Sequence, residues 1–443
     1  MSTALVLLQL AVVLALIFIG ARVGSIGLGI YGMVGVFILV FVFGLEPGNI
    51  PIDVMLIIVA VITASAALQA AGGLDYMVEV AARFLRKHPN HITFYGPLTT
   101  WLFCLLAGTA HTCYALLPII SEIALKAKIR PERPLSVATI SASLGITGSP
   151  VSAATAAILS QSLLGDKGIG MREIFIVTIP ASLIAILVAS FVQNHVGKPL
   201  EEDPEYQRRV REGLLKPDDG RNEQEKDLNP RARWAVAAFL LGVLLVVLFG
   251  SFPGLRPSFD GVPVSMNATI EMTMMAVAAV ILLVGKADVK VAVKGNVFAS
   301  GMTAMVSIFG VAWMGSTFFE GNKEAILGSV AGLFTSWPVL FAIPLFIFSI
   351  MLFSQAATVK TLYPVGLSMG IPPLVLLALF PAVNGYFFLP NYPTEVAAIG
   401  FDRTGTTRIG KYVVNHSFQL AGFITTLVSI GVSYLIITLL QAA

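Results

Sequence analysis

The stretch Pro134–Leu164 reads PLSVATISASLGITGSPVSAATAAILSQSLL, and it is the segment from which the fold can be predicted. It is longer than the about 20 apolar residues that cross the hydrocarbon of a bilayer as a helix. The sequence TGSPVS, at Thr147–Ser152, interrupts it near the middle. Irregular backbone at membrane depth persists only where it is buried in protein or lines a cavity. We therefore predict a broken helix here, with a binding site close to the break.

The composition of the chain places it in a membrane. The 443 residues are 56% hydrophobic and 12% charged, and 17 of the 53 charged residues lie in Gly197–Pro230. A soluble protein has about 25% charged residues, so too few charges remain here for a soluble surface. This excludes a soluble enzyme, a nucleic-acid-binding protein and a disordered chain. The two cysteines, Cys104 and Cys113, lack the spacing of metal ligands.

Twelve apolar segments are candidates for spans or hairpins. They are Thr3–Ala21, Ile26–Gly44, Ile52–Ala71, Thr93–Glu122, Pro134–Leu164, Glu173–His195, Ala232–Gly250, Val262–Gly285, Asn296–Phe319, Phe334–Gly370, Pro372–Gly400 and Tyr412–Leu440. Three of them besides Pro134–Leu164 are too long for one helix and are interrupted, at AGTAHT, at FSQAAT and at FLPNYPT. The four interruptions are the first places to look for a site.

The distribution of Lys and Arg predicts the topology, because basic residues are retained on the cytoplasmic side. If Thr93–Glu122 and Phe334–Gly370 are re-entrant hairpins and the N-terminus is outside, 23 of the 28 basic residues lie inside. The outside loops then hold Lys167, Arg172, Arg256 and Lys323. We therefore expect an all-α polytopic membrane protein with about ten transmembrane helices, two re-entrant hairpins and two broken helices. Both termini would be periplasmic.

The two halves of the chain have the same order of three spans, a hairpin, a broken helix and a last span. Five crossings reverse the side of entry, so residues 1–196 and 231–443 are predicted to be inverted repeats. The charged segment 197–230 would join them as a solvated cytoplasmic linker. The hairpin tips GTAHTCYALLP (Gly108–Pro118) and SQAATVKTLYP (Ser354–Pro364) share four aligned residues, which supports the repeat.

Helix ends at the four breaks predict the chemistry of the site. The helix that follows each break would start near mid-membrane, with unpaired N–H groups and about half a positive charge. Ser149 and Pro150 suit the cap and the first position of such a helix, and Glu395 suits the first turn of another. A site built in this way suits a small anion, and the opposite helix ends suit a co-transported cation.

Four ionisable residues lie within predicted spans, where each is a functional candidate. Lys360 could bind a substrate carboxylate or form a structural ion pair with Glu395. Glu395 could carry a coupling proton or cap its helix. His111 could contact ligand or proton, or could be a hydrogen-bonded core residue. For Glu271, a buried structural carboxyl is preferred to a proton relay.

Neutral hydrogen-bonding groups surround the same breaks and would make a polar centre. They are Ser149, Ser152, Gln355, Thr358, Asn384, Asn391 and Thr394. Asp402 and Arg403 lie near the inner end of the second broken helix and are expected to form an interfacial ion pair.

Several of these stretches resemble the anaerobic four-carbon dicarboxylate carriers of bacteria, the Dcu family. The segments that carry the resemblance are LGITGSPVSAA, FSQAAT, GTAHTCYALLPII, KAKIRPERPLS and LPNYPTEVAAIGFDRTGTTRIGKYVVNHSF. The resemblance covers essentially the whole chain, and Leu389–Phe418 is its most specific part. It implies a transporter in the bacterial inner membrane that exchanges fumarate, malate or aspartate for succinate, and that can couple uptake to cations.

The family is similar to the ion-transporter superfamily, which implies an elevator-like fold with a scaffold domain and a moving transport domain that holds both hairpins. Carried over by motif, the substrate site is predicted to comprise Gly108, Thr109, His111, Thr112, Gly148, Ser149, Pro150, Ser152, Ser354, Gln355, Thr358, Lys360, Asn384, Asn391, Pro393 and Thr394. His111, Glu395 and Glu271 are the candidates for proton or cation coupling.

Other classes of protein fit the sequence less well. A symporter for another small organic anion is the main alternative, and an anion channel would more naturally line its pore with continuous helices. An intramembrane enzyme would need a nucleophile with a base or a set of metal ligands, and HExxH does not occur. No cofactor is expected beyond a co-transported proton or sodium ion. The expected partners are dicarboxylates and membrane lipid, with a homodimer as an option, and no nucleic acid.

Overall fold

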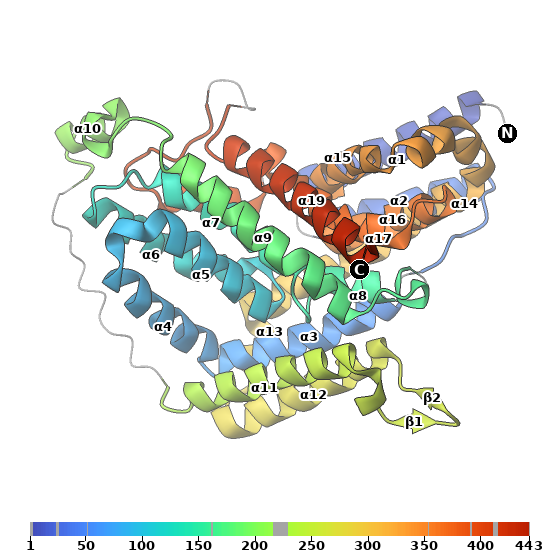
Figure 1. The fold of residues 1–443 in the computed structure, drawn as a ribbon, viewed down its shortest axis with the longest axis horizontal. Helices are drawn as coiled ribbons and strands as arrows, with labels where there is room; N and C mark the ends of the chain where they lie inside the picture. Colours follow the sequence, from blue (N-terminus) through green and yellow to red (C-terminus); the bar gives the residue numbers. More distant parts are fainter. Residues whose placement is uncertain are drawn as a thin grey trace.

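The computed structural model describes residues 3–23, 26–50, 52–160, 163–215, 229–352, 354–389, 392–410 and 415–442, and these are mostly helical. One group of helices packs together and takes three members from each half of the chain (Figure 1). Its members are α1 (Thr3–Val23), α2 (Gly27–Phe37) with the π-helical turn η1 (Ile38–Val42), α3 (Ile52–Ala70), α11 (Ala232–Ser251), α12 (Met266–Gly285) and α14 (Asn296–Ser336). We call this the first helix group.

Glycine allows the closest contact in the first helix group. A Cβ atom on Gly29 of α2 would lie 2.2 Å from the carbonyl oxygen of Val306 of α14, and one on Gly310 would lie 1.9 Å from the carbonyl oxygen of Gly29. Any larger residue would therefore push the two backbones apart. Small residues at such crossings are the usual means by which membrane helices pack closely.

The second helix group contains all four interrupted segments. Its members are α5 (Ile92–Ala107), η3 (Ala110–Thr112) and α6 (Cys113–Lys126); α7 (Glu132–Thr147) and α8 (Ala153–Leu159); α9 (Met171–Gln193); α15 (Ala342–Leu352) and α16 (Gln355–Ser368); α17 (Pro373–Ala378), η8 (Phe380–Phe388) and α18 (Pro393–Phe401); and α19 (Gln419–Ala442). Helix α5 packs on α7, and α9 packs on α19, so both halves of the chain contribute. At the border with the first group, α8 packs on α3 and α16 packs on α14.

Short elements connect these helices. They are the 3₁₀ turns η2 (Pro89–His91), η4 (Gly165–Lys167), η5 (Leu200–Glu202), η6 (Pro253–Leu255) and η7 (Pro338–Phe341), and the helices α4 (Gly73–Lys87), α10 (Pro204–Arg211) and α13 (Val289–Lys294). Strands β1 (Ser258–Phe259) and β2 (Val262–Pro263) form an antiparallel hairpin in which Ser258 pairs with Pro263.

The predicted interruptions are all present, and the main differences lie at the connections. Helix α4 is not predicted from the apolar pattern because it is amphipathic, with Val80 and Phe84 exposed on one face. It meets α3 at an angle of 71° at Gly72, whose φ of +75° favours glycine. Helix α14 extends to Ser336, beyond the expected end at Phe319.

The structure contains some of the predicted membrane crossings as helices of full spanning length. Five helices, α9, α11, α12, α14 and α19, have the length and apolar composition of a span, and two bent pairs raise the number to as many as seven in the described residues. The bent pairs are α3 with α4, and α17–η8 with α18. The other apolar stretches, Ala4–Gly20, Gly27–Val42 and Pro338–Ile350, are shorter than a full span. About ten crossings, like the inverted repeat, therefore stays a prediction.

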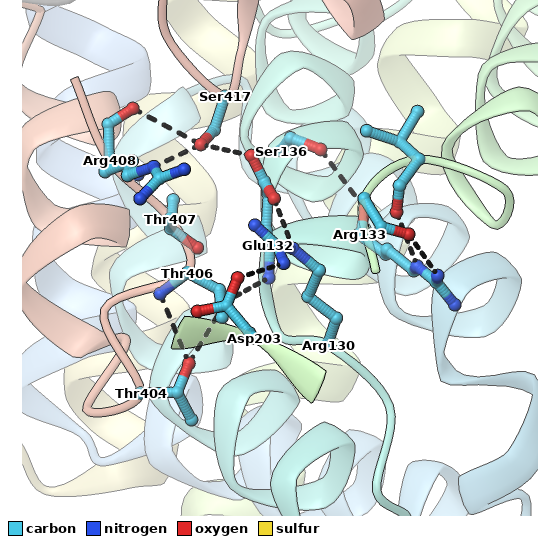
Figure 2. A network of polar contacts seen from close by, with 12 residues as sticks. Arg130, Glu132, Arg133, Ser136, Asp203, Thr404, Thr406, Thr407, Arg408 and Ser417 are labelled. Carbon is cyan, nitrogen blue, oxygen red and sulfur yellow. Dashed lines mark hydrogen bonds and ion pairs between the residues drawn. The ribbon is translucent and has the colours of Figure 1, made fainter. Parts of the chain in front are cut away.

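A buried charge network ties the turn between α6 and α7 to the linker (Figure 2). Arg130 donates from Nε to Glu132 Oε2 (2.5 Å) and from Nη1 to Asp203 Oδ2 (2.5 Å). All three side chains are buried. Asp203 also caps α10 by accepting from the N–H groups of Glu205 (2.9 Å) and Tyr206 (3.1 Å). This part of the linker is therefore docked on the second helix group, which corrects the prediction of a purely solvated linker.

The same network reaches the loop that precedes α19. Ser417 donates from Oγ to Glu132 Oε1 (2.6 Å), and the N–H of Glu132 donates to Thr406 Oγ1 (3.2 Å) (Figure 2). The loop therefore closes on the start of α7. Because Thr406 and Ser417 come from the second half of the chain, the contact joins the two halves.

Asp402 organises that loop. Its carboxylate accepts from the hydroxyl of Thr404, from Thr406 Oγ1 (2.8 Å) and from the N–H of Thr407 (2.6 Å). Neighbouring hydroxyl and N–H groups therefore satisfy the carboxylate, and the expected ion pair with Arg403 is not among its contacts within the described residues.

The start of α1 lies at the end of the molecule opposite the linker, and α19 runs toward that end (Figure 1). Asn229, near the C-terminal end of the linker, donates from Nδ2 to the carbonyl oxygens of Ala71 (3.2 Å) and Gly285 (3.5 Å), which places the C-terminal ends of α3 and α12 at the linker end of the molecule. Helix α19 starts beside Ser417 and runs away from this end, while the start of α1 and the β1–β2 hairpin lie at the far end (Figure 1). The predicted topology requires this arrangement; which end is cytoplasmic stays a prediction.

Cysteine accessibility tests the side of the membrane. Leu214, in the linker, and Phe259, in the β1–β2 hairpin, are exposed at opposite ends, and the native Cys104 and Cys113 are fully buried. An impermeant maleimide should label Phe259→Cys but not Leu214→Cys in intact cells, and should label both after the cells are opened. Labelling of Leu214→Cys in intact cells would reverse the assignment.

The ion pair of Arg130 with Asp203 should stabilise the fold in a pH-dependent way. Burial opposes the charge of Asp203, but hydrogen bonds from the Tyr206 N–H and from Arg130 outweigh it and lower the pKa of Asp203. Asp203→Asn keeps the helix cap and removes the charge. We expect the variant to lose about 1–3 kcal/mol at neutral pH, measured by thermal unfolding in detergent.

The difference in unfolding free energy between wild type and Asp203→Asn should become smaller as the pH falls. A lowered pKa in the folded state stabilises fully above the unfolded pKa, and this stabilisation is lost as the pH falls through the folded value. Glu201→Gln is the matched control, because Glu201 pairs with Lys128 on the exposed surface. Equal melting temperatures for the two variants would show that the buried pair does not stabilise the protein.

Candidate functional site

Side-chain caps pair with backbone N–H groups where the interrupted helices restart. Ser152 Oγ accepts from the N–H of Thr155 (3.1 Å) at the start of α8. Ser354 Oγ accepts from the N–H of Ala357 (3.2 Å) at the start of α16. Each serine pairs one N–H group that water would satisfy in a soluble protein. These two residues, predicted for the substrate site, therefore act as helix caps that stabilise the breaks.

The predicted start of α8 at Ser149 and Pro150 is wrong by about one turn. The helix begins at Ala153, after the cap at Ser152. Ser149 Oγ instead accepts from the N–H of Val151 (3.3 Å) within the preceding turn. Both serines are good caps, and the sequence does not show which of them the chain uses.

The tip of the first hairpin lies against the first broken helix. Gly108 ends α5 with a φ of +69°, and a Cβ atom there would lie 2.7 Å from the carbonyl oxygen of Val151. Only glycine fits both requirements. Thr109 follows, and its Oγ1 accepts from the N–H of His111 (3.3 Å). The hairpin and the break, predicted separately, therefore meet.

A cavity of about 100 Å³ lies where this hairpin and break meet α3 and α14. Its lining includes Thr109 and His111 from the hairpin, Ala153 from α8, Ser65 from α3 and Gly301 from α14. The cavity therefore lies at the border between the two helix groups. Ser65 was not predicted, because a single serine in an apolar helix is ordinary in sequence.

Two buried polar atoms in this lining have no hydrogen-bond partner in the described part of the chain. They are Nδ1 of His111 and Oγ of Ser65. The His111 ring stacks on Tyr114, with 5.6 Å between ring centroids, so its orientation is fixed. Buried polar groups in native proteins almost always have a hydrogen-bond partner. Two such atoms without a partner in the same cavity therefore point to a ligand.

The tip of the second hairpin is held by a polar pair. Gln355 donates from Nε2 to the carbonyl oxygen of Ser143 (2.8 Å) and to Oδ1 of Asn384. Asn384 in turn donates from Nδ2 to the carbonyl oxygen of Pro381 (3.1 Å). Both side chains are buried. These predicted site residues thus brace α16 against α7 and η8, and do not line the cavity.

Lys360 connects α16 to the end of α8. Its Nζ donates to Oγ of Ser160 at 3.0 Å, and the side chain is half-buried. The alternative ion pair with Glu395 is not formed within the described residues. Ser160 is thus a polar residue of the site region that sequence reasoning missed, because the two residues are 200 positions apart.

Glu395 is buried in the first turn of α18, as predicted, and accepts from Thr394 Oγ1 at 3.1 Å. Cys113 and Tyr392 lie close enough to Glu395 to interact with it electrostatically. The start of α18 therefore faces the start of α6, and a carboxyl group from the second half of the chain meets the first hairpin.

The other predicted residues are dispersed around these features. Thr112 donates to the carbonyl oxygen of Thr109 (3.0 Å), and Thr358 donates to that of Ser354 (2.8 Å). Gly148 ends α7, Pro393 starts α18, and Glu271 lies half-buried on α12 outside the cavity lining. Asn391 lies outside the described residues.

Comparison with known proteins finds relatives over nearly the whole chain. The family model described as anaerobic C4-dicarboxylate membrane transporter matches residues 5–441. The C4-dicarboxylate transporter DcuA of Wolinella succinogenes is 39% identical over 433 residues, which are 98% of this chain and 99% of that protein. The anaerobic C4-dicarboxylate transporter DcuB of Escherichia coli O157:H7 is 41% identical over 431 residues, covering 95% of this chain and 96% of its own.

Among solved structures, the YdaH transporter of Alcanivorax borkumensis overlaps with 85% of this chain and 83% of its own, at 15% identity and a TM-score of 0.44. That similarity is too low to support an argument about the fold. The sequence relatives are transporters and not enzymes, which confirms the expected class of protein. By the match over nearly its full length, the chain belongs to the family of anaerobic C4-dicarboxylate membrane transporters.

Proposed function

We propose that this protein is a secondary carrier that exchanges an external C4-dicarboxylate, such as fumarate, malate or aspartate, for internal succinate across the bacterial inner membrane. The relatives named above support the substrate class. The cavity at the first hairpin supports the site. A symporter for another small organic anion is the alternative against which the proposal is tested.

The observation that carries the proposal is the pair of unpartnered polar atoms in one cavity. His111 Nδ1 and Ser65 Oγ come from different helix groups, yet both line the same space. A carboxylate there would accept from the hydroxyl and from a protonated ring nitrogen. Leaving such atoms buried without a partner costs about 1–3 kcal/mol each, so a bound substrate that forms hydrogen bonds with them would remove this cost.

A dicarboxylate also needs positive charge, because desolvating two carboxylates costs several kcal/mol. The N-terminal end of α16 supplies partial positive charge, and Lys360 supplies a full one. Lys360 contacts Ser160, at the end of the short helix α8 that starts at the break. In the proposed bound state, Lys360 neutralises one carboxylate and the residues around Ser65 and His111 hold the other.

The arrangement of the helices favours alternating access by an elevator-like movement. The interrupted segments all belong to the second helix group, which would be the transport domain, and the first group would be the scaffold. The cavity lies between them, so a shift of one group along the other would move the site toward either face. Residues 1–196 and 231–443 would then be inverted repeats, as the chain order favours.

Coupling to a cation would use groups that lie beside the site. Glu395 is buried and bonded to Thr394, and His111 lines the cavity, so each is a candidate to carry a proton. A sodium ion is the other candidate. Neither coupling nor a homodimer is required for exchange.

Counterflow in proteoliposomes tests the proposed exchange. Internal succinate should accelerate the uptake of labelled aspartate, fumarate and succinate, because the carrier returns to its outward-facing state faster when it carries internal succinate. Added ATP should have no effect. Sodium and pH gradients are varied separately to identify the coupling ion. Equal uptake into empty and succinate-loaded vesicles would favour uniport or a channel.

Variants of the cavity and of Lys360 should weaken substrate binding. Lys360→Ala should lower the affinity for succinate by about 2–5 kcal/mol, the usual result of removing one partner of a buried charge pair. Ser65→Ala and His111→Ala should each lower it by about 1 kcal/mol or more, because one hydrogen bond is lost. The measurement is the concentration dependence of counterflow.

Two controls separate binding from structure. Thr63, two residues before Ser65 on α3, donates to the carbonyl oxygen of Val59 and does not line the cavity, so Thr63→Ala should leave the affinity unchanged. Ser160→Ala removes the contact of Lys360 while keeping its charge. If Ser160→Ala is as damaging as Lys360→Ala, the lysine acts through that contact, and the role of substrate ligand passes to His111.

A further inference from the structure

A second, larger cavity opens at the end of the molecule opposite the linker. This cleft has a volume of about 490 Å³ and lies between α14 and the α16–α17 connection. Lys167 of η4, Lys323 and Glu320 of α14, and Ser368 of α16 are among its lining residues. Because α14 belongs to the first helix group and α16 to the second, the cleft lies on the border where movement between the groups is proposed.

The lining carries more positive than negative charge. Lys323 lies 4.0 Å from Glu320, and both side chains are 46% exposed, so that pair is solvated and loose. Lys167 is exposed and comes from a different element. Only four of the 28 basic residues are predicted at this end of the molecule, and two of those four line the cleft. Half of the basic residues predicted at this end of the molecule therefore lie at one opening.

Lys360 lies about one helical turn along α16 from the lining of the cleft. Pro364, which lines it, is four residues beyond Lys360 on α16 and thus about one helical turn away on the same face. The Lys360 side chain contacts Ser160 at the end of α8, and the chain continues from there to Lys167 in η4. The three elements η4, α14 and α16 therefore each carry a lysine: Lys167 and Lys323 line the cleft, and Lys360 lies one turn from it.

We propose that this cleft is an outer binding site for dianionic dicarboxylates, in which Lys167 and Lys323 attract the substrate before it reaches Lys360. The inference rests on the proposed function and adds a site to it. A cleft with excess charge of one sign raises the local concentration of the opposite ion and speeds its association. The effect is screened over about 10 Å at 0.1 M salt, so ionic strength controls it.

The test measures initial rates of labelled succinate uptake into right-side-out membrane vesicles loaded with succinate. The double variant Lys167→Gln/Lys323→Gln should raise the external KM for succinate about threefold or more at about 0.01 M ionic strength, with kcat unchanged. The difference should vanish at about 0.5 M. Aspartate, which carries one net negative charge where succinate carries two, should be affected less.

Three controls assign the effect to charge at this cleft. Lys167→Arg/Lys323→Arg keeps the charge and should keep the wild-type KM. Lys290→Gln removes an exposed lysine near the start of α13, at the linker end, and should leave the external KM unchanged. The melting temperature of each purified variant shows that it is folded.

The proposal is overturned if the KM of the double variant equals that of wild type at low salt, if the ratio of the two is independent of salt, or if Lys290→Gln has the same effect. Failure of the underlying function would look different. In that case wild-type vesicles would show no acceleration by internal succinate, before any variant is compared.

Discussion

The structure depends on how backbone polar groups are paired where helices stop inside the apolar part of the protein. A continuous helix pairs its own N–H and C=O groups, but a broken one leaves several of each without a partner. In hydrocarbon each of these would cost several kcal/mol. Ser152 and Ser354 meet the need at the starts of α8 and α16, and Thr109 meets it at the tip of the first hairpin. The breaks are therefore stable because short polar side chains lie at the correct positions.

Once the breaks are stabilised, they become useful for binding. Helix starts collected in the interior present N–H groups and partial positive charge without bringing in a full charge that must be neutralised. The substrate class inferred from the family carries two carboxylates, so such ends suit it. Lys360 adds one full charge, but it is half-buried and its Nζ is already held by Ser160. Its energetic cost in the absence of substrate is therefore lower than that of a fully buried cation.

The sequence predicts the interruptions well because their causes are local. An apolar stretch too long for one span, with Gly, Ser, Pro or Thr in the middle, has few ways to cross a bilayer. The tertiary pairs that hold these segments and their connections together are not local. Gln355 contacts Asn384, Arg130 contacts Asp203, and Ser417 contacts Glu132 across 285 positions. Such pairs depend on tertiary packing, and each residue alone looks ordinary. For the same reason the sequence does not reveal Ser65, Ser160 or the hydrogen bond by which Asn384 braces the second hairpin.

The placement of charge in the structure also limits where movement can occur. The buried ion pairs of Arg130 with Glu132 and Asp203 lie within the second helix group and the linker, so these parts must move together or break the pairs. At the border between the groups, a Cβ on Gly315 of α14 would lie 2.6 Å from the methyl group of Thr361 on α16, a contact between small groups. Within the described residues no ion pair joins the two groups, so sliding along this border would separate none of them. Opening the network would strand buried charges at a cost of several kcal/mol. The border that contains the cavity and the cleft is therefore the surface along which the proposed movement would separate the fewest charges.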